Sequence, residues 1–296
     1  MCIRDRTWVN DTYLIFNEIE QFVFRIYQYG WRNQAEIKAE LELILLLKRK
    51  GLSVSYPISD SSKKYVQSFE AIEGTRFGVL FSFAKGEKPK SNSEELEFSI
   101  GNFMAKFHQQ TEGVELPRIQ YSPQILLDDS IERIGQYLQK DSEEFLFLKK
   151  FQQCFYKEKN KFNFEDFRRG VVHFDIWRDN LHSNKNKELT LFDFDFCGNG
   201  WLILDLAFHI IVNFITESNI EKYEAEMKSF WQGYENIFPI KKEEKDAIPL
   251  LAICTLIYYL SFQSEKFAAI YANEDYIKLV VNQRIKRWVN YCELDG

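Results

Sequence analysis

Short apolar runs separated by polar stretches mark the first part of the chain, as they do in a protein region made of strands. Residues 12–16 and 21–27 are rich in β-branched and aromatic side chains and flank a short polar stretch, which predicts a hairpin. Residues 64–70 and 77–83 have the same composition, with a Gly-Thr pair in the loop between them, and predict two further strands. This part of the chain should therefore form a small antiparallel sheet.

A helical spacing of apolar residues separates the two strand pairs. Asn33 can cap a helix start, Glu36 stands where it completes a capping box, and Gly51 follows a basic end. Four apolar residues fall on one face of this segment, at Ile37, Leu41, Ile44 and Leu45. One helix is therefore expected beside the sheet.

A polar stretch at residues 85–93 divides the chain. It is rich in Lys, Pro, Ser and Gly and cannot contribute to a core, so we predict one domain over residues 1–84 and a second over residues 85–296. Apolar residues beyond it recur at helical spacing, in segments 96–107, 124–160, 201–236 and 245–291. The predicted class is α+β, in which a small sheet-and-helix part precedes a larger, mainly helical part.

Composition and charge narrow the possible functions. The chain is 45% hydrophobic and 16% aromatic, as a folded globular protein is, and its formal charge of -6 gives no broad attraction for nucleic acid or anionic lipid. The five cysteines are odd in number and lack paired spacing, which favours a reducing cytoplasm. The apolar run 248–262 is shorter than a membrane span and contains Pro249, so we expect a buried core helix and no membrane partner.

An island of strand-like sequence interrupts the helical part. Residues 170–174, 180–182 and 188–196 have strand composition, and the polar residues 184–187 stand where the turn of a hairpin would be. The chain on either side has helical spacing. A strand, a loop and a hairpin are therefore expected here.

The loops of this island carry Asp175, Asn180 and Asp193. Phosphoryl transfer needs a carboxylate that orients the attacking hydroxyl and accepts its proton, and it needs oxygen ligands for magnesium. A lone His173-x-Asp175 pair is more often structural, but the ordered set in a strand-loop-hairpin context indicates a nucleotide site. Asp195 would share one side of the strand with Asp193, and it is either a further ligand or a structural acid.

This spacing resembles a known family. His173, Asp175, Asn180 and residues 192–195 match a pattern of His, any residue, Asp, four residues and Asn, followed by an Ile/Leu-Asp-Phe/Trp-Asp/Glu strand. On these residues the chain resembles the aminoglycoside phosphotransferase, choline kinase and homoserine kinase-like superfamily, which shares its core with protein kinases. The resemblance implies a protein-kinase-like two-lobed fold with ATP and Mg²⁺ as cofactors. It also implies transfer of the γ-phosphoryl group to a hydroxyl of a small molecule such as an aminoglycoside, choline or homoserine.

The resemblance assigns roles to individual residues. Asp175 would be the catalytic base, and Asn180 and Asp193 would be the magnesium ligands. Arg25 stands where the family has a strand lysine that touches the nucleotide phosphates, and Glu40 stands where that lysine has its ion-pair partner.

Further positions follow from the same comparison. Asn10, Asp11 and Thr12 resemble the phosphate loop, and the backbone of Ser82, Phe83 and Ala84 resembles the hinge that binds adenine. His173 resembles the structural histidine of the catalytic loop, and Asp205 resembles the aspartate that braces this loop.

Three departures from the family pattern favour other functions. Arginine replaces lysine at position 25, and Trp177 lies where many relatives have histidine or lysine. The chain begins shortly before Asn10, where a relative would already have completed a first strand, and residues 1–6 do not replace it, so this strand is expected to be missing and the reading frame to be truncated. The alternatives are a nucleotide-binding pseudokinase or scaffold, and a protein serine/threonine kinase. Nothing in the sequence indicates an oligomeric state.

Overall fold

Two compact units make up the chain in the computed structural model, which describes residues 2–6, 9–266 and 274–294. The first unit contains Met1–Asn92, Leu116–Arg118 and Trp177–Cys197, and the second contains Ser93–Glu115, Ile119–Ile176 and Gly198–Gly296. The boundary after residue 84 was placed from composition and stays a prediction. Two short later segments, which composition does not mark, belong to the first unit.

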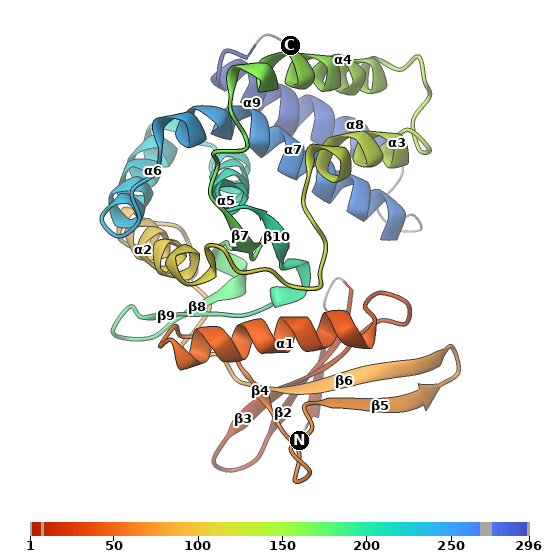
Figure 1. Ribbon diagram of the computed structural model, residues 1–296, viewed down its shortest axis with the longest axis vertical. Coiled ribbons are helices and arrows are strands. Elements are labelled where there is room, and N and C mark those ends of the chain that lie inside the picture. The colour runs from red at the N-terminus through yellow and green to blue at the C-terminus, as the bar shows by residue number, and fades with distance from the viewer. Residues whose placement is uncertain (1, 7–8, 267–273, 295–296) are drawn as a thin grey trace. The chain divides into compact units, whose positions relative to one another are not determined.

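A six-stranded antiparallel sheet lies in the first unit (Figure 1). Its strands are β1 (Cys2–Arg6), β2 (Asp11–Phe16), β3 (Gln21–Ile26), β4 (Pro57–Ile58), β5 (Val66–Ala71) and β6 (Gly74–Ser82). Their order is β1-β2-β3-β6-β4, and β5 also pairs with β6. The two strand pairs predicted from β-branched and aromatic composition are therefore confirmed, as the hairpins β2–β3 and β5–β6.

Strand β1 corrects the expectation that residues 1–6 cannot supply a first strand. Cys2 lies opposite Ile15 and Arg6 lies opposite Asp11, so this segment extends the sheet antiparallel to β2. Strands pair through backbone N–H and C=O groups, which every residue except proline carries. A polar composition therefore does not forbid an outer strand, and the expectation that residues 1–6 supply no first strand was wrong.

Helix α1 (Gln34–Arg49) lies along one face of this sheet (Figure 1). The Glu36 N–H donates to Asn33 Oδ1 at 3.0 Å and the Asn33 N–H donates to Glu36 Oε2 at 3.0 Å, which confirms the predicted capping box. Ile37 and Ile44 are among the residues of its buried face. The same face buries Glu40, and a buried carboxylate requires a partner.

A second hairpin of the first unit pairs β8 (Leu181–Ser183) with β9 (Leu189–Leu191). The predicted hairpin is confirmed, but its second strand ends at residue 191 and does not continue to 196. Asp193 adopts the left-handed conformation with φ 66°, and Phe194–Phe196 forms a single 3₁₀ turn. The expected period-two relation between Asp193 and Asp195 therefore does not apply, because it holds only in extended backbone.

Helices dominate the second unit (Figure 1). They are α2 (Glu94–Thr111), α3 (Asp129–Ile134), α4 (Glu143–Glu158), α5 (Ile203–Thr216), α6 (Ile220–Glu235), α7 (Lys242–Lys266), α8 (Glu274–Leu279) and α9 (Lys286–Tyr291). A short antiparallel pair, β7 (Arg169–Val172) and β10 (Gly198–Trp201), completes the unit. The predicted helical character is confirmed, although the expected segment 124–160 is interrupted near Gly135. Residues 267–273 of the expected segment 245–291 lie outside the described residues.

Two glycines allow α2 and α6 to approach closely, and Figure 1 shows these helices side by side. A Cβ on Gly101 would lie 2.1 Å from the main-chain oxygen of Phe230. A Cβ on Gly233 would lie 2.1 Å from the main-chain oxygen of Phe98. No side chain fits at such distances, so both positions require glycine.

Helix α7 contains the apolar run 248–262 noted in the sequence. Among the described residues, it is the one helix that length and composition would allow to cross a membrane, and 83% of its most apolar window is buried inside the protein. Burial of this kind is typical of a core helix.

Candidate active site

A buried aspartate anchors the loop that follows β7. Asp205, in the first turn of α5, accepts the N–H of His173 at 3.1 Å and the N–H of Phe174 at 2.6 Å. His108 Nε2 lies 3.0 Å from Asp205 Oδ2, and the Tyr234 hydroxyl lies 2.8 Å from His108 Nδ1. A carboxylate only accepts, so His108 donates from Nε2 and accepts the tyrosine proton at Nδ1. The expected brace by Asp205 is confirmed and extends to α2 and α6.

Phe174 carries backbone strain within this loop. Its φ is 64°, in the left-handed region, which costs a bulky residue about 1–2 kcal/mol. Its ring stacks on Tyr121 with centroids 4.1 Å apart, and its carbonyl accepts the Tyr259 hydroxyl at 2.7 Å. Strained residues persist only where surrounding contacts hold them, and they cluster at functional sites.

Asp175 follows directly and is only partly buried. Its N–H donates to Nδ1 of the buried His173 at 3.2 Å, so this histidine shapes the loop backbone as the resemblance implied. Beyond it, the Ile176 carbonyl lies 3.1 Å from Nδ1 of His209. The predicted base is therefore presented by a loop whose peptide groups are held on both sides, all within the second unit.

Asn180 and Asp193, the predicted magnesium ligands, belong to the first unit. The Phe192 N–H donates to the Asn180 carbonyl at 3.1 Å. The hairpin therefore brings the backbone of Asn180 next to Phe192, the residue that precedes Asp193. The Asp193 side chain is 35% exposed. Carboxylate and amide oxygens are suitable ligands for a hard cation.

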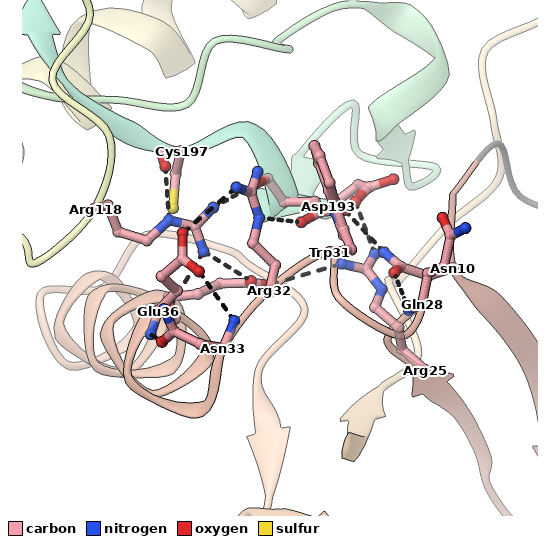
Figure 2. Close-up of polar contacts among 12 residues, drawn as sticks. Asn10, Arg25, Gln28, Trp31, Arg32, Asn33, Glu36, Arg118, Asp193 and Cys197 are labelled. Carbon is pink, nitrogen blue, oxygen red and sulfur yellow. Dashed lines mark hydrogen bonds and ion pairs between the residues drawn. The ribbon is translucent and has the colours of Figure 1, made fainter. Parts of the chain in front are cut away.

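Arg25 connects β3, α1 and the Asp193 turn within the first unit (Figure 2). Its Nη2 lies 2.8 Å from Asp193 Oδ1, and its Nη1 lies 3.6 Å from Glu40 Oε1. Burial would lower the pKa of Arg25, but the charge of Asp193 and of other nearby groups outweighs burial and raises it. The expected pairing of Arg25 with Glu40 is present, and a permanently charged guanidinium touches the predicted metal ligand.

Asp195 is enclosed by hydrogen-bond donors of the first unit. It is 3% exposed and accepts the Asn10 amide at 2.8 Å, the Trp31 indole at 2.8 Å and Arg32 Nε at 3.1 Å. Burial would raise the pKa of Asp195, but Arg32 and Arg25, together with the Trp31 hydrogen bond, hold it below its ordinary value. Of the two interpretations left open by the sequence, these contacts favour the structural one.

Arg118 is a residue that sequence reasoning missed (Figure 2). Its side chain is fully buried, and its Nε donates to the Cys197 carbonyl at 3.0 Å. Its Nη1 donates to the Glu36 carbonyl at 3.2 Å and to Glu40 Oε2 at 3.4 Å, and its Nη2 donates to the Asp195 carbonyl. Burial raises the pKa of Glu40, and Arg118 opposes that shift. No local motif marks a partner 78 residues away from Glu40.

The predicted phosphate loop lies at the start of β2. The Asn10 side chain is buried against Asp195, and Asp11 accepts Arg76 Nη2 at 2.8 Å. Thr12 lies within the strand. Since the side chains of Asn10 and Asp11 have partners inside the first unit, phosphate contacts here would come from backbone N–H groups. The role of this segment stays a prediction.

The predicted hinge begins at the last residue of β6. The Ser82 N–H donates to the Tyr56 carbonyl at 2.8 Å, and the Tyr56 N–H donates to Ser82 Oγ at 3.0 Å. His182 Nδ1 donates to the Ala84 carbonyl at 3.0 Å, and the Phe83 ring lies edge-on to His182. Adenine contacts from this segment would therefore come from the remaining peptide groups of Phe83 and Ala84, which stay predicted contacts.

The donor set suits a magnesium–nucleotide complex better than a protein-only metal site. Among residues 2–6, 9–266 and 274–294, no group of three or more His, Cys, Asp or Glu side chains could hold a metal ion. Mg²⁺ is typically bound by one or two carboxylates together with substrate phosphates and water. Asp193 and Asn180 fit that chemistry, and the guanidinium of Arg25, a group suited to phosphate oxygens, lies 2.8 Å from Asp193.

Comparison with known proteins identifies the family. The family described as "Phosphotransferase enzyme family" matches residues 4–238. The chain belongs to this family. A homoserine kinase of Gluconobacter oxydans is 26% identical to this phosphotransferase over 259 residues, which are 85% of this chain and 77% of the relative.

Solved structures agree in fold. An aminopropanol kinase associated with a microcompartment superposes with a TM-score of 0.81 at 17% identity and covers 100% of this chain and 94% of its own. An amicoumacin kinase in complex with AMP-PNP and Ca²⁺ gives 0.77 at 18% identity, covering 95% and 88%. The phosphotransferase therefore has the protein-kinase-like α+β fold that the resemblance implied.

Proposed function

We propose that this phosphotransferase uses ATP and Mg²⁺ to transfer the γ-phosphoryl group to a hydroxyl of a small molecule. The observation that carries the proposal is the position of Arg25, which lies 2.8 Å from Asp193 and 3.6 Å from Glu40 within the first unit. A charged guanidinium beside a partly exposed carboxylate forms a site for a phosphate and its metal. The anchored Asp175 of the second unit supports the proposal independently.

The residues of the first unit would bind and orient the nucleotide. Mg²⁺, when bound, neutralises negative charge on the phosphate oxygens. Asp193 and Asn180 would hold the ion, and Arg25 would form paired hydrogen bonds with phosphate oxygens. Glu40 and Arg118 keep the guanidinium in place, so little reorganisation is needed when the nucleotide binds.

Asp175 would act on the acceptor. Its carboxylate accepts the hydroxyl proton while the acceptor oxygen bonds to the γ-phosphorus and the bond from this phosphorus to the bridging oxygen breaks. ADP leaves with the electron pair of the broken bond. Asp205, His173 and Tyr259 hold the loop that carries this carboxylate, and pre-orientation of this kind contributes to the rate.

The acceptor is proposed at the level of a small alcohol. Homoserine and aminopropanol, after which two of the similar kinases are named, each combine a hydroxyl with an amine. The acids near the start of α6 add no argument for a cationic acceptor, because Glu217 and Glu226 both pair with Lys222. The cytoplasm remains the proposed location, on the number and spacing of the cysteines.

Two measurements test the proposed function. Thermal melting with Mg-ATP should show stabilisation of about 2.7 kcal/mol at a hundredfold excess over Kd, and ATP with EDTA should show less. Turnover of ATP should then be measured with homoserine, aminopropanol, choline and an aminoglycoside as acceptors. Stimulation by one alcohol supports the proposal, whereas indifference of both melting and turnover would contradict it.

A further inference from the structure

Tyr259 of α7 is fixed by aromatic packing beside the predicted catalytic loop. Its ring stacks on Phe208 with centroids 4.7 Å apart and an interplanar angle of 24°, and on Phe174 at 5.8 Å and 17°. Stacked rings leave a phenol little freedom to rotate out of place. The direction of its hydroxyl is therefore set by the packing of α5, α7 and the loop, all within the second unit.

This hydroxyl reaches two groups of the loop. It donates to the Phe174 carbonyl at 2.7 Å, and the Asp175 side chain lies within hydrogen-bonding reach of it. Burial raises the pKa of Tyr259, and the charge of Asp175 raises it further, so the phenol keeps its proton. The single phenol proton thus has two acceptors within reach, the carbonyl of a strained residue and the carboxylate that follows it.

Asp205 and Tyr259 hold the two sides of the same residue. Asp205 accepts the N–H of Phe174 at 2.6 Å, and Tyr259 donates to its carbonyl. With φ at 64°, Phe174 would relax towards ordinary backbone if either contact were lost, and Asp175 would turn with it. Tyr259 also lies within reach of the carboxylate itself, whereas Asp205 contacts the loop through its backbone N–H groups.

We propose that Tyr259 is a positioning residue for Asp175, whose hydroxyl fixes the orientation of the carboxylate towards the acceptor. The inference rests on the proposed function, because a positioned base matters only if Asp175 receives a proton. A hydrogen bond to a charged group that is lost in the transition state lowers the rate by about 10- to 100-fold. Since the same hydroxyl proton also bonds to the Phe174 carbonyl, the lower end is expected, about 10-fold in kcat.

The test is Tyr259→Phe, which keeps the stacked ring and removes only the hydroxyl. Tyr156→Phe is a matched control, because the Tyr156 hydroxyl donates to the Asp128 carboxylate at 2.5 Å elsewhere in the second unit. Both variants lose one tyrosine–carboxylate hydrogen bond and should melt at similar temperatures. Only Tyr259→Phe should lower kcat, with the KM for ATP unchanged.

The pH profile of kcat separates positioning from a structural role. Loss of a donor to the charged carboxylate favours its protonated form, so the acid limb should move to higher pH in Tyr259→Phe and stay in place in Tyr156→Phe. Suppose that the wild type binds Mg-ATP and phosphorylates an alcohol. A normal kcat and an unmoved acid limb in Tyr259→Phe would then overturn the positioning role alone. A wild type that does neither would overturn the proposed function, and the inference with it.

Discussion

Replacing Asp193 should mainly weaken nucleotide binding, whereas replacing Asp195 should mainly lower the stability of the fold. Asp193→Asn removes the carboxylate that lies beside Arg25, and Asp195→Asn removes the one that is buried among Asn10, Trp31 and Arg32. Both changes keep the size of the side chain and delete one negative charge. Their effects should differ because the two side chains differ in burial, at 35% and 5% exposure.

The structure sets the expected magnitudes. Removing one partner of a buried ion pair costs about 3–5 kcal/mol. Arg32 would keep Glu36 at 3.6 Å and its stack on the Trp31 ring at 4.1 Å, so we expect about 3 kcal/mol for Asp195→Asn. At roughly 2–4 °C per kcal/mol, melting should fall by about 6–12 °C. Solvent screens Asp193, so its replacement should cost about 1 kcal/mol or less.

Thermal melting of both variants with and without Mg-ATP gives the assay. Asp193→Asn should melt close to wild type but lose most of the stabilisation by Mg-ATP, because a neutral amide holds a hard cation weakly. Asp195→Asn should melt far lower and keep most of that stabilisation. Equal losses in the two variants, or the reverse assignment, would refute the distinction between a metal ligand and a structural acid.

Three further outcomes follow from the described contacts. Because the pKa of Asp195 lies below its ordinary value of 3.8, its carboxylate stabilises the fold fully at neutral pH, and this stabilisation is lost as the pH falls through and below 3.8. In urea unfolding, the free energies of unfolding of wild type and Asp195→Asn should therefore converge in acid. Arg25→Lys should weaken Mg-ATP binding roughly 10-fold by calorimetry, because lysine cannot form paired bonds to phosphate oxygens. Gly233→Ala should lower the free energy of unfolding by about 1–3 kcal/mol through overpacking against α2, whereas the exposed Gln232→Ala on the same helix should be near neutral in urea unfolding.

Local patterns predicted those parts of the fold that local physics determines. The capping box at Asn33, the β2–β3 hairpin and the hairpin of residues 181–191 each depend on residues a few positions apart, and each is present. Strand β1 was missed because its pairing uses backbone groups that composition does not reveal. The left-handed Asp193 was missed because a turn after a strand depends on the contacts that hold it, which lie far away in sequence.

In the candidate site too, residues of the sequence motif were predicted and their distant partners were not. The order of Asp175, Asn180 and Asp193 along the chain identified the family motif, but the neighbours that hold these residues come from other segments. Arg118 and Tyr259 reach their partners over 78 and 85 positions, where no periodicity or spacing connects them. Such residues can be identified only from the folded structure, in which packing places them beside a buried charge or a strained peptide group.

The central claim is tested most directly by Asp175→Asn, which keeps the shape of the side chain but cannot accept the hydroxyl proton. Single-turnover transfer and Mg-ATP affinity would be measured on the same preparation, with the acceptor that stimulates wild type. Transfer should fall about 10²- to 10⁴-fold, the usual effect of losing a positioned general base, while Mg-ATP affinity stays close to wild type. Near-normal transfer in this variant would contradict the assignment of Asp175 as the base.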